Sequence, residues 1–157
     1  MQIEELAERA LTLPPGRRVI ALAGAPGSGK STWAERLAAR LGSACVLSMD
    51  GFHYDDLVLT PRGLRPRKGA PETFDVAGLR HMLERLRRNE EAEIAVPVFD
   101  RGLEVARAGA RLIGREVRFV VAEGNYLLLR ESPWASLHAL YDLTVMLEVP
   151  EPVLRER

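Results

Sequence analysis

The chain has 157 residues, of which 46% are hydrophobic and 28% charged, and its 22 lysine and arginine residues balance 22 aspartate and glutamate residues. This composition is typical of one globular domain and excludes a disordered or collagen-like chain. A net charge of zero provides no basic field for nucleic acid or anionic lipid, so we expect a small-molecule partner, no nucleic acid and no membrane. The sequence leaves open whether the chain is a monomer or a homodimer.

Cysteine content and the absence of long apolar runs predict the compartment. Cys45 is the only cysteine, so no intramolecular disulfide can form and nothing indicates an oxidising compartment. The N-terminal segment MQIEELAERA carries three glutamates and no apolar core of a signal peptide. No run approaches the roughly 20 apolar residues of a membrane span. We therefore expect a cytoplasmic protein.

The first part of the chain alternates predicted helices and buried strands. Apolar residues at helical spacing predict a helix over residues 3–12, and the apolar run 19–23 predicts a strand that is buried on both faces. A glycine-rich loop follows. A second helical pattern runs from Ser31 to Gly42, and residues 44–47 predict a second buried strand.

The middle of the chain is less regular. Residues 50–71 contain three prolines among scattered glycines and arginines, which predicts a long surface excursion without a regular element. Apolar spacing then predicts a helix over 75–88, with Asp75 as its N-terminal cap. We interpret 94–99 and 111–113 as short strands of a lid-like subdomain.

Two more apolar strands are predicted near the end of the chain, over residues 117–122 and 143–147, with a helix over 133–140 between them. Strands that alternate with helices imply right-handed crossovers and a parallel sheet. The expected fold class is therefore α/β, a three-layer sandwich with a mostly parallel sheet and helices on both faces.

The stretch GAPGSGKS, residues 24–31, matches the pattern G-x-x-x-x-G-K-[ST] and lies between a predicted strand and a predicted helix. In that position glycines let backbone N–H groups surround phosphate oxygens, and the helix N-terminus adds positive potential. Lys30 would reach the β- and γ-phosphates, and the Ser31 hydroxyl would bind Mg²⁺. A glycine-rich turn without a ligand is the alternative. The predicted nucleotide-binding residues are Gly24, Ala25, Pro26, Gly27, Ser28, Gly29, Lys30, Ser31 and Thr32.

Two carboxylates follow apolar strands and are candidate catalytic or metal-binding groups. Asp50 lies just past a predicted parallel strand, where open α/β sheets bind ligands. It could accept a hydroxyl proton or help to hold the metal, or it could merely start a turn. Glu123 ends the apolar segment VRFVVAEG, which is the position of an acid that orients Mg²⁺. A salt-bridged structural acid is the alternative for Glu123.

Candidate acceptor-binding residues are distributed between the excursion and the lid-like strands. The cations Arg62, Arg65, Arg67 and Lys68 occur between Asp56 and Glu72 without an intervening acid, so they could bind an anionic group or form a solvated loop. From this patch we select Lys68, and we add Arg101, His53 and Phe99. The histidine could instead be incidental, and the phenylalanine could fill the core.

Five motifs in order resemble the phosphoribulokinase/uridine kinase family of P-loop kinases: GAPGSGKS, MDGFH, RKGAPETFD, PVFDR and AEGNYLL. The third is similar to bacterial pantothenate kinases, and the fourth is similar to uridine kinases and their relatives. The resemblance implies a P-loop NTPase-type sandwich that uses ATP and Mg²⁺ to phosphorylate a hydroxyl of a sugar, a nucleoside or a pantothenate-like metabolite. It implies that Asp50 is the base and that Glu123 is an acid associated with magnesium. Lys30 is the third predicted catalytic residue.

Departures from the family leave the acceptor open. Gly69 stands where uridine kinases carry an acid that binds the ribose, which argues against a nucleoside, and pantothenate kinases differ downstream of Phe99. Family members also continue beyond the helix start predicted at Pro150, whereas this sequence ends at Arg157. We therefore expect residues 1–157 to be a single P-loop kinase domain without the C-terminal lid and the last strand.

Two other functions remain in competition. A non-catalytic nucleotide-binding module, or an inactive truncated kinase, would explain the absence of lid cations. A GTPase-like switch is disfavoured because the sequence contains no N-K-x-D guanine motif.

Overall fold

The central sheet is parallel, and its strand order differs from the chain order. The computed structural model describes residues 1–150, so the helix predicted after Pro150 lies outside the described residues. The four strands of the sheet are arranged in the order β2-β5-β1-β6, and all neighbouring pairs run parallel. Their bounds are β1 (Arg18–Gly24), β2 (Ala44–Ser48), β5 (Phe119–Gly124) and β6 (Leu143–Leu147).

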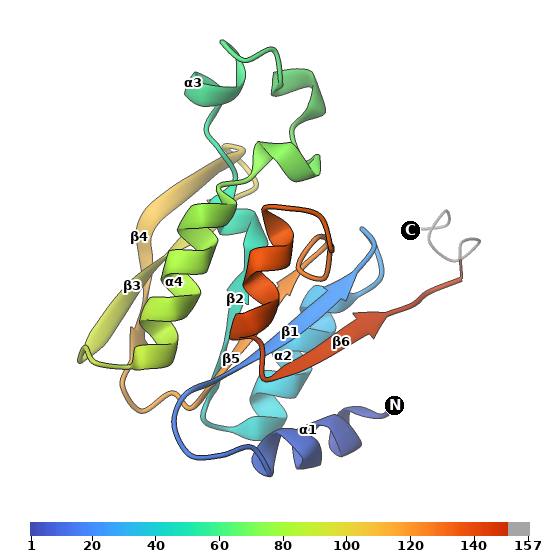
Figure 1. Ribbon diagram of the computed structural model, residues 1–157, viewed down its shortest axis with the longest axis vertical. Coiled ribbons are helices and arrows are strands. Elements are labelled where there is room, and N and C mark those ends of the chain that lie inside the picture. Colours follow the sequence, from blue (N-terminus) through green and yellow to red (C-terminus); the bar gives the residue numbers. More distant parts are fainter. Residues whose placement is uncertain (151–157) are drawn as a thin grey trace.

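Helices cover both faces of this sheet, which confirms the predicted three-layer α/β sandwich (Figure 1). One face carries α1 (Ile3–Leu11) and α2 (Lys30–Leu41). The other carries α4 (Val76–Arg88) and the 3₁₀ helix η4 (Trp134–Leu140). An antiparallel hairpin of β3 (Glu93–Asp100) and β4 (Val105–Gly114) packs beside α4. Within residues 1–150, no helix has both the length and the apolar character needed to span a membrane.

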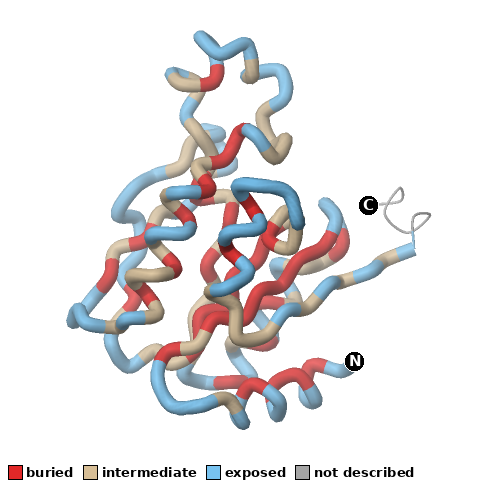
Figure 2. Tube along the Cα trace, viewed as in Figure 1, coloured by how far each residue is buried: buried red, intermediate tan, exposed pale blue. Residues whose placement is uncertain are grey.

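Alternate residues of the central strands enter two separate hydrophobic cores. On β1, Ile20 and Leu22 pack with α1 and α2, whereas Val19, Ala21 and Ala23 pack with α4 and the hairpin. Strands β1 and β5 are buried along nearly their whole length (Figure 2). Burial on both faces explains why their sequences are continuously apolar.

The excursion over residues 50–71 differs from the prediction because it contains short helical segments. These are η1 (Met49–Phe52), α3 (Asp56–Leu59) and η2 (Arg65–Arg67), and η3 (Pro71–Thr73) follows them. The Asp55 side chain caps α3 by accepting a hydrogen bond from the Leu57 N–H at 2.8 Å. Single-turn helices of this kind depend on local capping hydrogen bonds. The spacing of hydrophobic residues therefore does not predict them.

Three further elements differ from the prediction in their bounds or their type. Strand β4 begins at Val105 rather than at residue 111, because pairing with β3 defines it and most of its residues are exposed. Strand β5 runs to Gly124, so Glu123 lies inside the strand rather than at its end. The last predicted helix, over 133–140, forms as the 3₁₀ helix η4.

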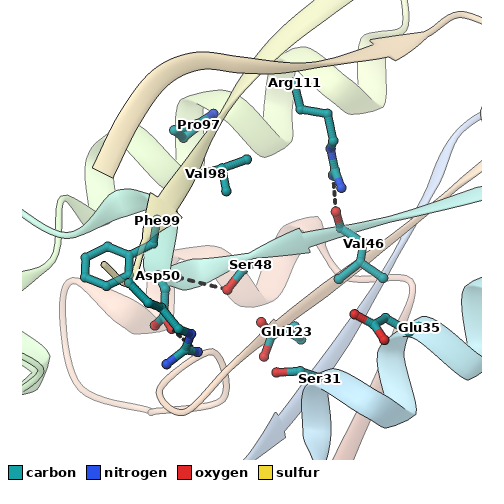
Figure 3. Close-up of a pocket in the computed structure, with 11 residues that line it drawn as sticks. Ser31, Glu35, Val46, Ser48, Asp50, Pro97, Val98, Phe99, Arg111 and Glu123 are labelled. Carbon is teal, nitrogen blue, oxygen red and sulfur yellow. Dashed lines mark hydrogen bonds and ion pairs between the residues drawn. The ribbon is translucent and has the colours of Figure 1, made fainter. Parts of the chain in front are cut away.

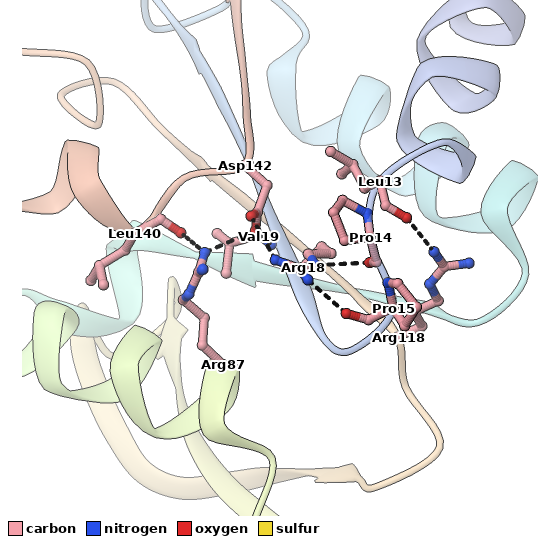
Figure 4. Close-up of polar contacts among 9 residues, drawn as sticks. All are labelled: Leu13, Pro14, Pro15, Arg18, Val19, Arg87, Arg118, Leu140 and Asp142. Atoms are coloured by element: carbon pink, nitrogen blue, oxygen red, sulfur yellow. Dashed lines mark hydrogen bonds and ion pairs between the residues drawn. The ribbon is translucent and has the colours of Figure 1, made fainter.

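One carboxylate joins the starts of β6 and β1 to the end of α4 (Figure 4). Asp142 Oδ2 accepts hydrogen bonds from the Val19 backbone N–H at 2.8 Å and from Arg87 Nη1 at 2.9 Å. Its Oδ1 accepts a third from Arg18 Nη1 at 3.3 Å. The carboxylate side chain is only 12% exposed, so these bonds are partly shielded from water. They fix the strand that carries the glycine-rich loop.

We predict that Asp142→Ala lowers the free energy of unfolding by about 2–4 kcal/mol, because one backbone N–H and two guanidinium groups lose their acceptor. Urea denaturation measures this change. Glu8 on α1 is exposed, and Glu8→Ala serves as the control, with an expected change within about 0.5 kcal/mol. Equal stabilities of the two variants would contradict this role of Asp142.

Candidate active site

The glycine-rich loop connects the end of β1 to the start of α2. Gly27 and Gly29 have positive φ angles of 76° and 83°, which side-chain-bearing residues rarely adopt. A Cβ atom at Gly24 would lie 2.6 Å from Ser28 Oγ and 3.2 Å from the Leu147 carbonyl oxygen. The loop backbone therefore packs too closely at Gly24 for a larger residue, and the first N–H groups of α2 open toward the loop.

Three side chains at this loop, those of Ser28, Lys30 and Ser31, form no polar contact within residues 1–150. Ser28 is 6% exposed, and its Oγ is buried without a hydrogen bond. Within residues 1–150, neither the Lys30 ammonium nor the Ser31 hydroxyl forms a hydrogen bond or an ion pair. A buried hydroxyl without a partner costs free energy unless a ligand or water binds it. This donor set fits the oxygens of a polyphosphate.

The two candidate carboxylates lie at the same edge of the sheet as the loop. In the strand register Glu123 of β5 stands between Leu22 of β1 and Ser48 of β2. Asp50 follows two residues after Ser48, in η1, and its N–H donates to the Ser48 hydroxyl at 3.3 Å. Glu123 is 5% exposed, and its carboxylate forms no hydrogen bond or ion pair within residues 1–150. A buried carboxylate without a partner is expensive, which favours a cation or water as its ligand.

A cavity of about 250 Å³ joins these groups to the β3–β4 hairpin (Figure 3). Five of the predicted site residues line it: Ser31, Asp50, Phe99, Arg101 and Glu123. The lining residues are Ser31, Glu35, Val46, Ser48, Asp50, Pro97, Val98, Phe99, Arg101, Arg111 and Glu123. The cavity therefore brings together groups from α2, β2, β3, β4 and β5 that are distant in the sequence.

Arg101 is the cation nearest to the proposed base. Its Nη2 lies 3.6 Å from Asp50 Oδ2, and its side chain is 82% exposed. An ion pair this exposed contributes little to stability. The guanidinium can therefore leave Asp50 for another anion at small cost.

His53 lies behind the base rather than in the same cavity. Its Nδ1 is 2.8 Å from the Asp50 carbonyl oxygen, so this nitrogen carries the proton that the carbonyl accepts. The ring packs between Phe74 and Phe99, with centroid distances of 4.1 and 4.6 Å. His53 thus contacts both the backbone of the base and an aromatic wall of the cavity.

The basic patch of the excursion is mostly paired with its flanking acids. Lys68 Nζ donates to Asp56 at 2.9 Å and to the Glu104 carbonyl at 2.6 Å. Arg65 also binds Asp56, at 3.1 Å. The hydrogen bond from Lys68, and to a smaller extent the one from Arg65, hold the pKa of the Asp56 carboxyl below its usual value. Lys68 does not line the cavity that contains Asp50. Three of the four cations predicted as a patch are therefore engaged by the two flanking acids, Asp56 and Glu72.

Two charged residues of the cavity were missed by sequence reasoning. Glu35 lies one helical turn after Ser31 on α2, and this i, i+4 spacing could have indicated it. Arg111 lies on the exposed strand β4, and its guanidinium donates a hydrogen bond to the Val46 carbonyl of β2. No local pattern marks Arg111, because its neighbours in space are 65 residues away in sequence.

A cage of protein ligands for a metal is absent from residues 1–150, in which no group of three or more His, Cys, Asp or Glu side chains is placed to hold an ion. Magnesium in kinase sites is usually held by one or two carboxylates, waters and phosphate oxygens. The donors Ser31, Asp50 and Glu123, which line one cavity, fit that second type of site.

Comparisons with known proteins agree with this geometry. A family model described as an AAA domain matches residues 19–157. The chain is 44% identical to a "putative fructose transport system kinase" of Silicibacter sp. TM1040, whose crystal structure it matches with a TM-score of 0.92 over 99% of this chain and 79% of the other. It is 36% identical to a "Putative uridine kinase" of Schizosaccharomyces pombe, over 98% of this chain and 71% of that protein.

A further relative is YggC of Escherichia coli, which is 39% identical over 151 residues, or 92% of this chain. This chain spans 61% of the length of that relative. The family model, the identities and the common structure agree with the ordered motifs of the sequence. The chain therefore belongs to the family of P-loop domains matched by this model, as a P-loop kinase of the phosphoribulokinase/uridine kinase type.

Proposed function

We propose that the protein is an ATP-dependent kinase that transfers the γ-phosphoryl group to a hydroxyl of a small metabolite. The observation that carries this proposal is the position of the glycine-rich loop at the same sheet edge as two acids. Lys30 and Ser31 are the first residues of α2, directly after the loop. Ser31, Asp50 and Glu123 line one cavity. Phosphoryl transfer requires mainly positioning and neutralisation of charge, which these groups can supply.

The loop, residues 24–32, would hold ATP by its backbone N–H groups and Lys30, and Ser31, Glu123 and Asp50 would hold Mg²⁺. When bound, Mg·ATP supplies the phosphoryl group and the cation that neutralises it. Asp50 accepts the hydroxyl proton as the acceptor oxygen bonds to the γ-phosphorus and the bond to the bridging oxygen breaks. The products are ADP and a phosphate monoester.

The acceptor would occupy the cavity next to the β3–β4 hairpin. Phe99 and Arg101 lie on its wall together with Asp50, which supports their predicted role in acceptor binding. His53 would act by supporting Asp50 and Phe99, both of which it contacts. Lys68 would act only after release from Asp56. The names of the relatives described above favour a sugar or a nucleoside as the acceptor, and the motif RKGAPETFD favours a pantothenate-like compound.

We predict that Lys30→Ala lowers kcat/KM for acceptor-dependent ADP release by about 10²–10³-fold, because a cation is lost where charge develops on the transferred group. A coupled assay with a panel of sugars, uridine and pantothenate measures this change. Arg36 on the exposed side of α2 provides the control variant Arg36→Ala, which should keep full activity. Undiminished transfer by Lys30→Ala would refute the assignment.

We predict that Asp50→Asn lowers kcat by about 10²–10⁴-fold through the loss of the general base, while the affinity for an ATP analogue measured without Mg²⁺ changes by less than about threefold. Asp55→Asn is the matched control, because asparagine caps helices as well as aspartate does and Asp55 caps α3 outside the cavity. Tight binding of Mg·ATP by the wild type, with no acceptor-dependent turnover, would instead favour the non-catalytic module.

A further inference from the structure

The cavity has a second polar end that the proposed transfer step does not use. Glu35 of α2 and Arg111 of β4 line it beside Val46 of β2, and their side chains extend toward Val46 from opposite sides (Figure 3). Asp50 and Phe99 lie toward the other end in the same view. A molecule that places one hydroxyl at Asp50 could therefore extend toward Glu35 and Arg111.

These two residues carry opposite charges that are not paired with each other. Within residues 1–150, the Glu35 carboxylate forms no hydrogen bond or ion pair. Arg111 has no carboxylate partner in that part of the chain, and its hydrogen bond goes to the Val46 carbonyl. A guanidinium has five N–H donors, so Arg111 keeps donors for a ligand while its backbone contact orients the side chain.

The combination of an acceptor-only group and a donor-only group selects the chemistry of the ligand. A carboxylate accepts hydrogen bonds from hydroxyl groups, and a guanidinium donates to their oxygens. A phosphate or carboxylate at this end could bind Arg111 but would be repelled by Glu35, Asp50 and Glu123, which line the same cavity. An uncharged group with adjacent hydroxyls satisfies both residues. The apolar neighbours Pro97 and Val98 suit the C–H groups of such a molecule.

From this arrangement, and resting on the proposed kinase function, we infer that the acceptor is an uncharged polyhydroxyl compound of monosaccharide size. Glu35 and Arg111 bind adjacent hydroxyls remote from the one that is phosphorylated. They determine specificity and take no part in the transfer step. Sugars that already carry a phosphate or a carboxylate are rejected.

The test measures binding and turnover with defined probes. D-Fructose, D-ribose and D-glucose are compared with fructose 6-phosphate, ribose 5-phosphate and D-gluconate, with a non-hydrolysable ATP analogue and Mg²⁺ present for binding and ATP for turnover. We expect at least one uncharged sugar to bind about 10-fold or more tightly than its anionic counterpart. Glu35→Gln and Arg111→Met should each raise KM for that sugar by about 10- to 100-fold, with a smaller change in kcat. Glu35→Gln should also reduce the ratio between the affinity for the uncharged sugar and the affinity for its anionic counterpart.

Glu8→Gln and Arg36→Met are the matched controls, since both residues are exposed and lie outside the cavity. If Arg111→Met does not fold, Glu35→Gln alone decides the test, because it is an isosteric change at an exposed helix position. Tighter binding of the anionic sugars, an unchanged KM in the variants, or no sugar binding by a protein that binds the ATP analogue would each overturn the inference. Failure to bind the analogue would instead overturn the proposed kinase function.

Discussion

The structure depends on the common alignment of three parallel strands whose carboxyl ends meet at one edge of the sheet. Strand β5 pairs with β1 on one side and with β2 on the other. This pairing places the glycine-rich loop, Glu123 and the turn that carries Asp50 on adjacent strand ends. Ligands of open α/β sheets bind at such edges. The chemistry of the site is therefore a consequence of strand order, and no single loop could create it.

Buried polar groups differ sharply between the scaffold and this edge. Arg17 is 4% exposed, and its guanidinium donates to the carbonyls of Val117, Leu86 and Gly114 at 2.8, 3.3 and 2.6 Å. Burial lowers the pKa of this group, but the three acceptors compensate the lost water. At the sheet edge, by contrast, Ser28 Oγ and the Glu123 carboxylate have no partner within residues 1–150. The buried guanidinium of Arg17 is thus satisfied within the fold, whereas Ser28 and Glu123 remain available for a ligand.

Local patterns predicted the parts of the site that lie on one element, and failed where distant segments meet. The glycine loop and Asp50 follow apolar strands and Glu123 lies near the end of one, so the amino-acid pattern alone was enough to predict their common edge. The pairing of Lys68 with Asp56 required the fold of the excursion, which short capped turns define. Arg111 reaches the cavity because the β3–β4 hairpin brings its guanidinium to the Val46 carbonyl of β2. Helical periodicity marks Glu35 as a neighbour of Ser31, but it does not reveal that both line one cavity.

The central claim is that Glu123 and the loop hold a magnesium-bound triphosphate together. Calorimetric titration with a non-hydrolysable ATP analogue, with and without Mg²⁺, tests it most directly on the wild type and on Glu123→Gln. The account predicts that Mg²⁺ strengthens binding to the wild type by about 10-fold or more, and that this gain is largely lost in the variant. Equal gains from Mg²⁺ in both proteins, or no binding of the analogue to the wild type, would contradict it.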